Sequence, residues 1–398
     1  MSSGLVIVLA VAAGVPLLLG FLPWLRLPGA LLEIAAGVVL GPSLLGWVEP
    51  DETIRVLALL GLSILLFLAG YEVDPRRFRG HTGKTVGFSL AMSVVAAVLV
   101  AVVLSAAGVD GGIVIGIGLL ATSLGLIVPV LADSGALDKP VGRLTVAGAS
   151  AGEIAAVVVL SVGLAGSDTP LAGKLLLLGL LLLGLGVIAA VVVGAEHSMR
   201  ITAIIRRSAD TSAQIRIRLT VLLVAGLALA AEGLGFEAIL GAFLAGVLVR
   251  SLDPEPEKTH PLYPVKLEAV GFGLLVPIFF ITSGLNLDLS GLVDSPSALL
   301  LVPVFLAALC IVRGLPALAF RGDLATRDVI VVGLLQATSL PFLLTVSQIG
   351  TEMDLIDPAT AAGLITAGLV SVLVFPAVAL RLISKEESHA NSKAALSQ

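Results

Sequence analysis

"GLLATSL" at residues 118–124 and "GLLQATSL" at residues 333–340 place nearly the same polar pair in the middle of two long apolar runs. The pairs are Thr122-Ser123 and Thr338-Ser339. A buried hydroxyl group costs free energy unless it finds a hydrogen-bond partner. A polar pair that recurs in two apolar runs therefore indicates a duplicated structural feature.

The composition indicates the environment in which these apolar runs lie. Of the 398 residues, 58% are hydrophobic and 13% are charged, and the mean hydropathy is +1.11. A water-soluble globule has too little interior to hide so many apolar side chains. The charged residues form short clusters between runs long enough to cross a hydrocarbon core about 30 Å thick. The sequence therefore predicts an all-α integral membrane protein with many spans.

Thirteen apolar runs can be counted along the chain. They lie near residues 3–23, 30–47, 53–72, 84–107, 111–133, 141–166, 171–194, 215–232, 236–251, 266–286, 296–320, 327–350 and 358–382. The eighth and ninth runs are short and close together, so twelve spans with one re-entrant pair is the alternative count. With thirteen spans, 20 of the 23 Lys and Arg residues fall on one side of the membrane. Because basic residues accumulate in cytoplasmic loops, this predicts an N-terminus outside, a C-terminus inside and thirteen spans.

In this topology the two polar pairs cross the membrane in opposite directions. Thr122 and Thr338 each lie about 11 residues from one end of their run, or roughly 16 Å deep at 1.5 Å per residue. A proline follows each pair, at Pro129 and at Pro341. Proline inside a helix removes a backbone hydrogen bond. We therefore expect two interrupted helices, broken at Pro129 and Pro341, in an inverted repeat.

Inverted repeats with broken helices at matching positions are typical of secondary transporters. Ser and Thr in membrane helices more often bond to the helix backbone or to a neighbouring helix, which is the alternative for either pair alone. The matched depth, opposite direction and following proline favour a binding site. Gln336, which precedes the second pair, is a possible further lining residue.

Two ionisable residues lie well inside the predicted spans, and such residues usually mark a transport pathway. Glu153 lies about 12 residues into the sixth run, with Ser150 three residues before it, and Arg313 lies in the eleventh run. Burial disfavours an ionised carboxylate, whereas a cation bound by it and by hydroxyl or carbonyl oxygens favours it. Proton and cation then compete for Glu153, while Arg313 compensates charge. One titrating group predicts one proton per monovalent cation, which is electroneutral exchange.

Several stretches together resemble the monovalent cation:proton antiporter-2 family. They are "LEIAAGVVLGPSLLG" (32–46), "LGLSILLFLAGYEVDPRRF" (60–78), "ATSLGLIVPVLADSG" (121–135) and "PIFFITSGLNLDL" (277–289), with "RGLPAL" and "LLQATSLPF". The resemblance implies the sodium/proton antiporter fold, with two crossed broken helices in a mobile core and a dimer-forming scaffold. The core is expected at about 84–166 and 296–382 and the scaffold at about 1–72 and 171–286. Together they form a transmembrane domain over 1–382, followed by a short cytoplasmic tail over 383–398.

The resemblance also implies roles for single residues. The essential acid of the family falls on Glu153 and its basic core residue on Arg313. Many members carry an acid, Asn or Gln before an essential Asp, whereas this chain has Gly152 before a Glu.

The expected function is exchange of Na⁺ or K⁺ for protons across the inner membrane of a prokaryote, by a homodimer in the lipid bilayer. The alternatives are a gated cation channel and a divergent member of the fold that does not exchange ions. An enzyme is not expected, because no other midplane acid or His accompanies Glu153. No cofactor and no nucleic-acid partner are expected.

Overall fold

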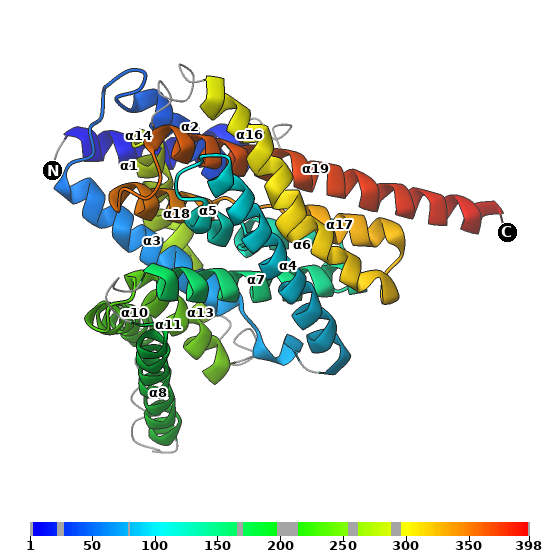
Figure 1. Ribbon diagram of the computed structural model, residues 1–398, viewed down its shortest axis with the longest axis horizontal. Coiled ribbons are helices and arrows are strands. Elements are labelled where there is room, and N and C mark those ends of the chain that lie inside the picture. The colour runs from blue at the N-terminus through cyan, green and yellow to red at the C-terminus, as the bar shows by residue number, and fades with distance from the viewer. Residues whose placement is uncertain are drawn as a thin grey trace. The chain divides into compact units, whose positions relative to one another are not determined.

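The computed structural model describes residues 3–21, 28–78, 80–164, 170–196, 214–253, 262–287 and 296–396. These residues are helical or in short connections, without a strand, so the predicted all-α class is confirmed. The α-helices are α1 Ser3–Phe21, α2 Gly29–Leu40, α3 Glu52–Glu72, α4 Gly80–Ala106, α5 Gly112–Gly118, α6 Leu124–Asp133, α7 Pro140–Leu164, α8 Leu171–Glu196, α10 Ile215–Gly233, α11 Ala238–Leu252, α13 Leu262–Val270, α14 Val276–Leu285, α16 Pro296–Leu309, α17 Thr326–Gln336, α18 Pro341–Glu352 and α19 Pro358–Leu396 (Figure 1).

Four short helical turns complete the described elements. They are the 3₁₀ turns η1 Pro75–Phe78 and η4 Leu315–Gly322 and the π turns η2 Gly271–Leu275 and η3 Cys310–Gly314. The turn η2 joins α13 to α14, and η3 with η4 extends α16. These additions give two apolar segments, 262–285 and 299–322, that are long enough to cross a membrane.

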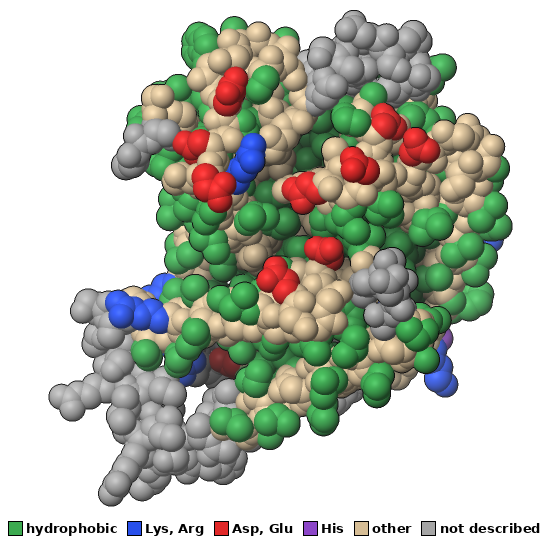
Figure 2. Space-filling view, turned by 60° about the vertical axis from the view of Figure 1, so that its left-hand side comes forward, with side chains coloured by type: hydrophobic (Ala, Val, Ile, Leu, Met, Phe, Trp, Pro, Cys, Tyr) green, Lys and Arg blue, Asp and Glu red, His purple; other side chains and the backbone are tan. Residues whose placement is uncertain are grey.

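The chain is a multi-pass membrane protein by length and polarity of its helices. Nine helical segments within the described residues are long and apolar enough to span, and two shorter apolar helices, α2 and α11, accompany them. Large apolar side chains remain on the surface, among them Leu176, Leu183 and Val103. Figure 2 shows hydrophobic side chains spread over the face in view. Such an apolar exterior requires a lipid environment. The count of thirteen spans stays a prediction.

The chain divides into two compact units. Unit 1 contains residues 1–15, 49–75 and 157–282, and unit 2 contains residues 16–48, 76–156 and 283–398. In unit 1, the backbones of α3 and α11 lie in direct contact at Gly70 and Gly246. A Cβ atom at Gly70 would overlap the Phe243 carbonyl, and one at Gly246 would overlap the Phe67 carbonyl. Small residues allow this close backbone approach between membrane helices.

Unit 2 contains the two interrupted helices. The first is α5 followed by α6, with the chain unwound at Leu119–Ser123, and the second is α17 followed by α18, with the chain unwound at Ala337–Leu340. The helices α4, α16 and α19 and the first part of α7 belong to the same unit. Both ATSL stretches lie at the breaks, so the predicted broken-helix pair is confirmed.

Candidate functional site

The two unwound segments are joined through their backbones. The Ser123 amide donates a hydrogen bond to the Thr338 carbonyl at 3.0 Å. A backbone group inside a membrane needs a partner wherever the helix is interrupted, and here each interruption supplies one for the other. The breaks therefore cross at the two ATSL stretches.

Thr122 links this crossing to a buried charge. Its hydroxyl donates to the Gln336 carbonyl at 2.5 Å and accepts from Arg313 Nε at 2.9 Å. Gln336 is the last residue of α17, where a carbonyl lacks a partner in its own helix and carries the negative end of the helix dipole. One hydroxyl group of Thr122 thus bonds the terminal carbonyl of α17 and also orients the Arg313 guanidinium.

Arg313 lies in the π turn η3 and is only 1% exposed. Besides Thr122, its guanidinium donates from Nη1 to the Ser93 hydroxyl at 3.2 Å and from Nη2 to the Gly148 carbonyl at 2.7 Å. A π turn within an α-helix commonly marks a functional position. Because all three guanidinium nitrogens have partners, on α4, on α7 and in the segment between α5 and α6, the positive charge is held in one place.

Glu153 on α7 is the buried countercharge. It is 6% exposed, and its carboxylate attracts Arg313 electrostatically. A buried charge is tolerated when an opposite charge and hydrogen bonds compensate for the lost water. The crossing, Arg313 and Glu153 therefore form one buried polar centre within unit 2.

Two glycines on α7 leave room for this centre. A Cβ atom at Gly152 would lie 2.6 Å from Arg313 Cζ and 2.7 Å from the Leu120 carbonyl oxygen. A Cβ atom at Gly148 would overlap the side-chain amide of Gln336. Gly152 is thus the position against which the guanidinium packs.

A model of the transmembrane region of the sodium/hydrogen exchanger family matches residues 7–383. The chain belongs to this family. The crossing of its broken helices and its buried Glu153 and Arg313 all lie within the matched region.

Curated exchanger relatives show the same affiliation. The chain is 28% identical to the putative Na⁺/H⁺ antiporter YjbQ of Bacillus subtilis, over 98% of this chain and 64% of that protein. It is 28% identical to cation/H⁺ antiporter 18 of Arabidopsis thaliana, over 88% of this chain and 45% of that protein. The chain thus spans about half to two thirds of these two relatives. It is 26% identical to a Na⁺/H⁺ antiporter of Enterococcus hirae, over 88% of this chain and 91% of that one.

A solved exchanger structure shares the fold. The sodium proton antiporter MjNhaP1 of Methanocaldococcus jannaschii superposes with a TM-score of 0.67, over 96% of this chain and 98% of that chain, at 16% identity. The similarity in three dimensions at such low identity supports the fold of the exchanger family. The predicted sodium/proton antiporter fold is therefore confirmed.

The other hydroxyl residues predicted for the exchanger site have different surroundings. Ser150 donates to the Val146 carbonyl at 2.9 Å within α7, and Thr338, in the unwound segment, donates to the Leu334 carbonyl of α17 at 3.2 Å. Ser339 is 1% exposed, and its hydroxyl has no hydrogen-bond partner within the described residues. Their role in binding an ion stays a prediction.

Gln336 is fully buried and faces α7. Its Nε2 lies 3.5 Å from the Leu144 carbonyl, and its Oε1 has no partner among the described residues. An unpaired amide oxygen in a membrane interior is costly unless water or an ion binds it. This observation strengthens the prediction that Gln336 lines the site.

The prolines differ in what they do. Pro341 is the first residue of α18, where proline is favoured because its missing N–H has no partner in the helix anyway. Pro129 lies inside α6, and the break lies upstream of it at Leu119–Ser123. The prediction that Pro129 breaks the helix is therefore wrong. The unwound segment is stabilised instead by the bonds of Thr122 and Ser123 to the other break.

The sequence analysis missed three contributors. Ser93 and the Gly148 carbonyl bind Arg313, and Ser371 on α19 accepts from the Ser339 amide at 3.2 Å and donates to the Ser339 carbonyl at 3.1 Å. Ser89 and Ser93 lie four residues apart on the buried face of α4. This helical spacing of two serines in an apolar run is the feature of the sequence that indicates a polar contact there.

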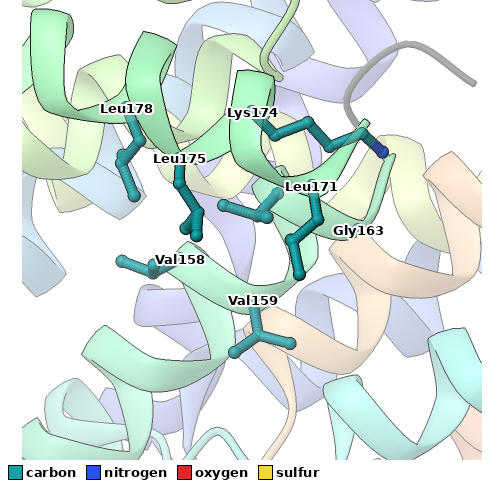
Figure 3. A pocket seen from close by; sticks show the side chains of 8 residues that line it. Val158, Val159, Gly163, Leu171, Lys174, Leu175 and Leu178 are labelled. Carbon is teal, nitrogen blue, oxygen red and sulfur yellow. The ribbon is translucent and has the colours of Figure 1, made fainter. Parts of the chain in front are cut away.

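A cavity of about 420 Å³ in unit 1 lies between the end of α7 and the start of α8. Val and Leu side chains line it together with Gly163 and Lys174, as Figure 3 shows. This lining offers a cation no side-chain oxygen, and its one charged group is positive.

Proposed function

We propose that this protein exchanges a monovalent cation, Na⁺ or K⁺, for protons by alternating access, with Glu153 binding proton and cation in turn. The observation that carries the proposal is the buried Glu153 beside Arg313 at the crossing of two broken helices. The relatives named Na⁺/H⁺ and cation/H⁺ antiporters support it.

The fixed charge of Arg313 determines how many protons are exchanged for each cation in this proposal. A guanidinium does not release its proton under physiological conditions. The centre then carries one net positive charge both when Glu153 is protonated and when ionised Glu153 holds a monovalent cation. Since the two loaded states have equal charge, a full cycle moves one proton against one cation and no net charge.

Oxygen atoms near Glu153 supply the remaining ligands in this proposal. Alkali cations prefer hard oxygen ligands such as carboxylate, hydroxyl and carbonyl groups. The candidates are Thr122, Ser123, Ser150, Thr338 and Ser339, with Gln336 at the edge. The unpaired buried oxygens of Ser339 and Gln336 favour these two residues for direct contact.

The larger organisation is part of the same proposal. The elements of the crossing all belong to unit 2, which contains residues 84–156 and 296–382 of the moving core proposed at about 84–166 and 296–382. Unit 2 also contains residues 16–48 of the proposed scaffold, and residues 157–166 of the proposed core belong to unit 1. The remaining segments at about 1–72 and 171–286 serve as the scaffold of a homodimer, and residues 383–398 form a cytoplasmic tail. In the proposed topology, which the bias of Lys and Arg supports, the N-terminus lies outside and the C-terminus inside the membrane, and the proposed membrane is a prokaryotic plasma membrane.

The experiment uses purified protein in proteoliposomes with an imposed pH gradient and a pH-sensitive dye. Na⁺, K⁺, Li⁺ or choline is added to the wild type, to Glu153→Gln and to Asp110→Asn, which removes an exposed acid of unit 2 as a control. An alkali cation is expected to collapse the gradient in the wild type and the control only. Unaltered exchange by Glu153→Gln would refute the one-carboxylate mechanism, and cation flux without proton movement would indicate a channel.

A further inference from the structure

A second cavity, partly lined by polar side chains, lies in unit 2 at the end of α18 remote from the crossing. It encloses about 220 Å³ between one face of α18, the start of α19 and the end of α14. Glu352 and Asn286 are exposed at its rim, whereas Ser347 and Ile365 are buried at its depth. The cavity therefore leads from the surface into the unit beside α18.

Four of the five α18 residues that line this cavity carry side-chain oxygen atoms, and the fifth is Leu344. Ser347, Gln348, Thr351 and Glu352 recur at the three- and four-residue spacing that puts side chains on one face of a helix. Gln348 Nε2 donates to Glu352 Oε1 at 3.0 Å, which leaves the amide oxygen of Gln348 as an acceptor. Thr351 donates to the Ser347 carbonyl at 2.7 Å, and its oxygen keeps lone pairs that accept.

Ser347 supplies an independent observation. The residue is 1% exposed, and its hydroxyl has no hydrogen-bond partner within the part of the chain that the structure describes. Buried polar atoms in proteins are bonded to protein, water or an ion in the great majority of cases. Because Ser347 lines this cavity, its unpaired hydroxyl indicates a ligand that completes it.

The chemistry of the lining selects the ligand. One carboxylate with amide and hydroxyl oxygens repels anions and matches the hard ligands of an alkali cation. Ca²⁺ ordinarily recruits several carboxylates, and within the described residues no group of three or more Asp, Glu, His or Cys is placed to hold a metal. A single negative charge fits a monovalent cation.

We infer that this cavity is a capture site for the monovalent cation, separate from Glu153. The inference rests on the proposed exchange, because the captured ion is its substrate. Ser347 lies six residues from Pro341, or about 9 Å along the helix, and Glu352 eleven residues, or about 16 Å. A cation passing from Glu352 to Ser347 covers nearly half of the length of α18 toward the crossing.

The transport test compares two cavity variants with a matched control. Glu352→Gln and Ser347→Ala are each assayed with Asp354→Asn, which removes an exposed negative charge two residues from Glu352 and outside the cavity lining. The apparent KM for the cation is expected to rise about 3- to 10-fold in both cavity variants for cation added on one face of the membrane, with kcat unchanged. An unchanged KM, or an equal rise in Asp354→Asn, overturns the capture site.

A binding test separates this inference from the proposed function. Thermal stability of the detergent-solubilised protein is measured in NaCl, KCl and choline chloride, with Glu153→Gln as the background. A rise in Tm with Na⁺ or K⁺ over choline is expected to persist in Glu153→Gln and to disappear when Glu352→Gln is added. Persistence of the rise in the double variant refutes the capture site and leaves the exchange mechanism intact. If the wild-type protein shows no exchange but its Tm still rises with Na⁺ or K⁺, the exchange mechanism is refuted and the capture site is not.

Discussion

The two ATSL stretches have the same sequence but make different hydrogen bonds. At the first break, Thr122 bonds outward, to Arg313 and to the Gln336 carbonyl of the other broken helix. At the second break, Thr338 bonds back to Leu334 of its own helix, and Ser371 holds the backbone of Ser339. The two copies thus share the backbone crossing, whereas their side chains have specialised. The first copy orients the charge, and the second maintains the interruption.

The largest effect is expected from removing the charge that only the first break binds. Arg313→Gln leaves Glu153 buried without its countercharge, and breaking a buried pair in this way costs about 3–5 kcal/mol. We expect loss of exchange and a clearly lower Tm by thermal unfolding. Arg321→Gln, an exposed position on the same helical segment, is the control and is expected to retain both. If Arg313→Gln exchanges ions at the wild-type rate, the claim that the first break is specialised to orient this charge is wrong.

A smaller loss is expected when the space for the guanidinium is filled. In Gly152→Ala the new methyl group meets Arg313 and the Leu120 carbonyl, and such overpacking costs about 1–3 kcal/mol. Exchange is expected to fall about 10-fold or more at equal protein level, measured in proteoliposomes. Gly87→Ala is the matched control, because nothing lies within 4 Å of a Cβ atom there. Equal activity of the two variants would show that Arg313 is not fixed against α7.

The direct comparison of the two copies is Thr122→Val against Thr338→Val. Valine keeps the shape and removes the hydroxyl. At Thr122 this leaves a charged donor and a helix-terminal carbonyl unpaired, at a cost of about 1.5–3 kcal/mol, whereas at Thr338 one ordinary bond worth about 1 kcal/mol is lost. Exchange is expected to fall about 10-fold in Thr122→Val and less than 3-fold in Thr338→Val. Equal losses would mean that the copies have not specialised.

The smallest effect concerns the support of the second break. Ser371→Ala removes the hydroxyl that bonds both the amide and the carbonyl of Ser339, and we expect a destabilisation of about 1 kcal/mol. Ser150→Ala, which loses only a bond within α7, is expected to stay within about 0.5 kcal/mol of the wild type. Thermal unfolding of both variants gives the comparison. The reverse ranking would place structural support on α7 and not on α19.

Much of this arrangement follows from the sequence. Apolar run lengths predict the helices, and the repeated ATSL stretch predicts both interruptions. Glu153 and Arg313 are visible because ionisable residues are rare in membrane spans. Their roles in ion binding stay predictions.

The remaining features depend on tertiary contacts. Whether a serine bonds its own helix, as Ser150 does, or a distant group, as Ser93 does, depends on neighbours that spacing alone does not reveal. The place of Pro129 inside α6 depends on tertiary contacts in the same way, because a helix tolerates proline where surrounding groups bond the freed carbonyl. Gly152 acquires its meaning only once Arg313 is seen to occupy the adjacent space.

The most direct test of the account is the charge moved in one exchange cycle. Purified protein in proteoliposomes is given fixed gradients of cation and proton, and the rate and end-point of proton movement are compared with and without an imposed membrane potential. Because Arg313 keeps its charge while Glu153 alternates between proton and cation, the account predicts one proton per cation and no effect of the potential. An end-point that shifts with the potential would contradict it, since a further titrating group would then have to take part.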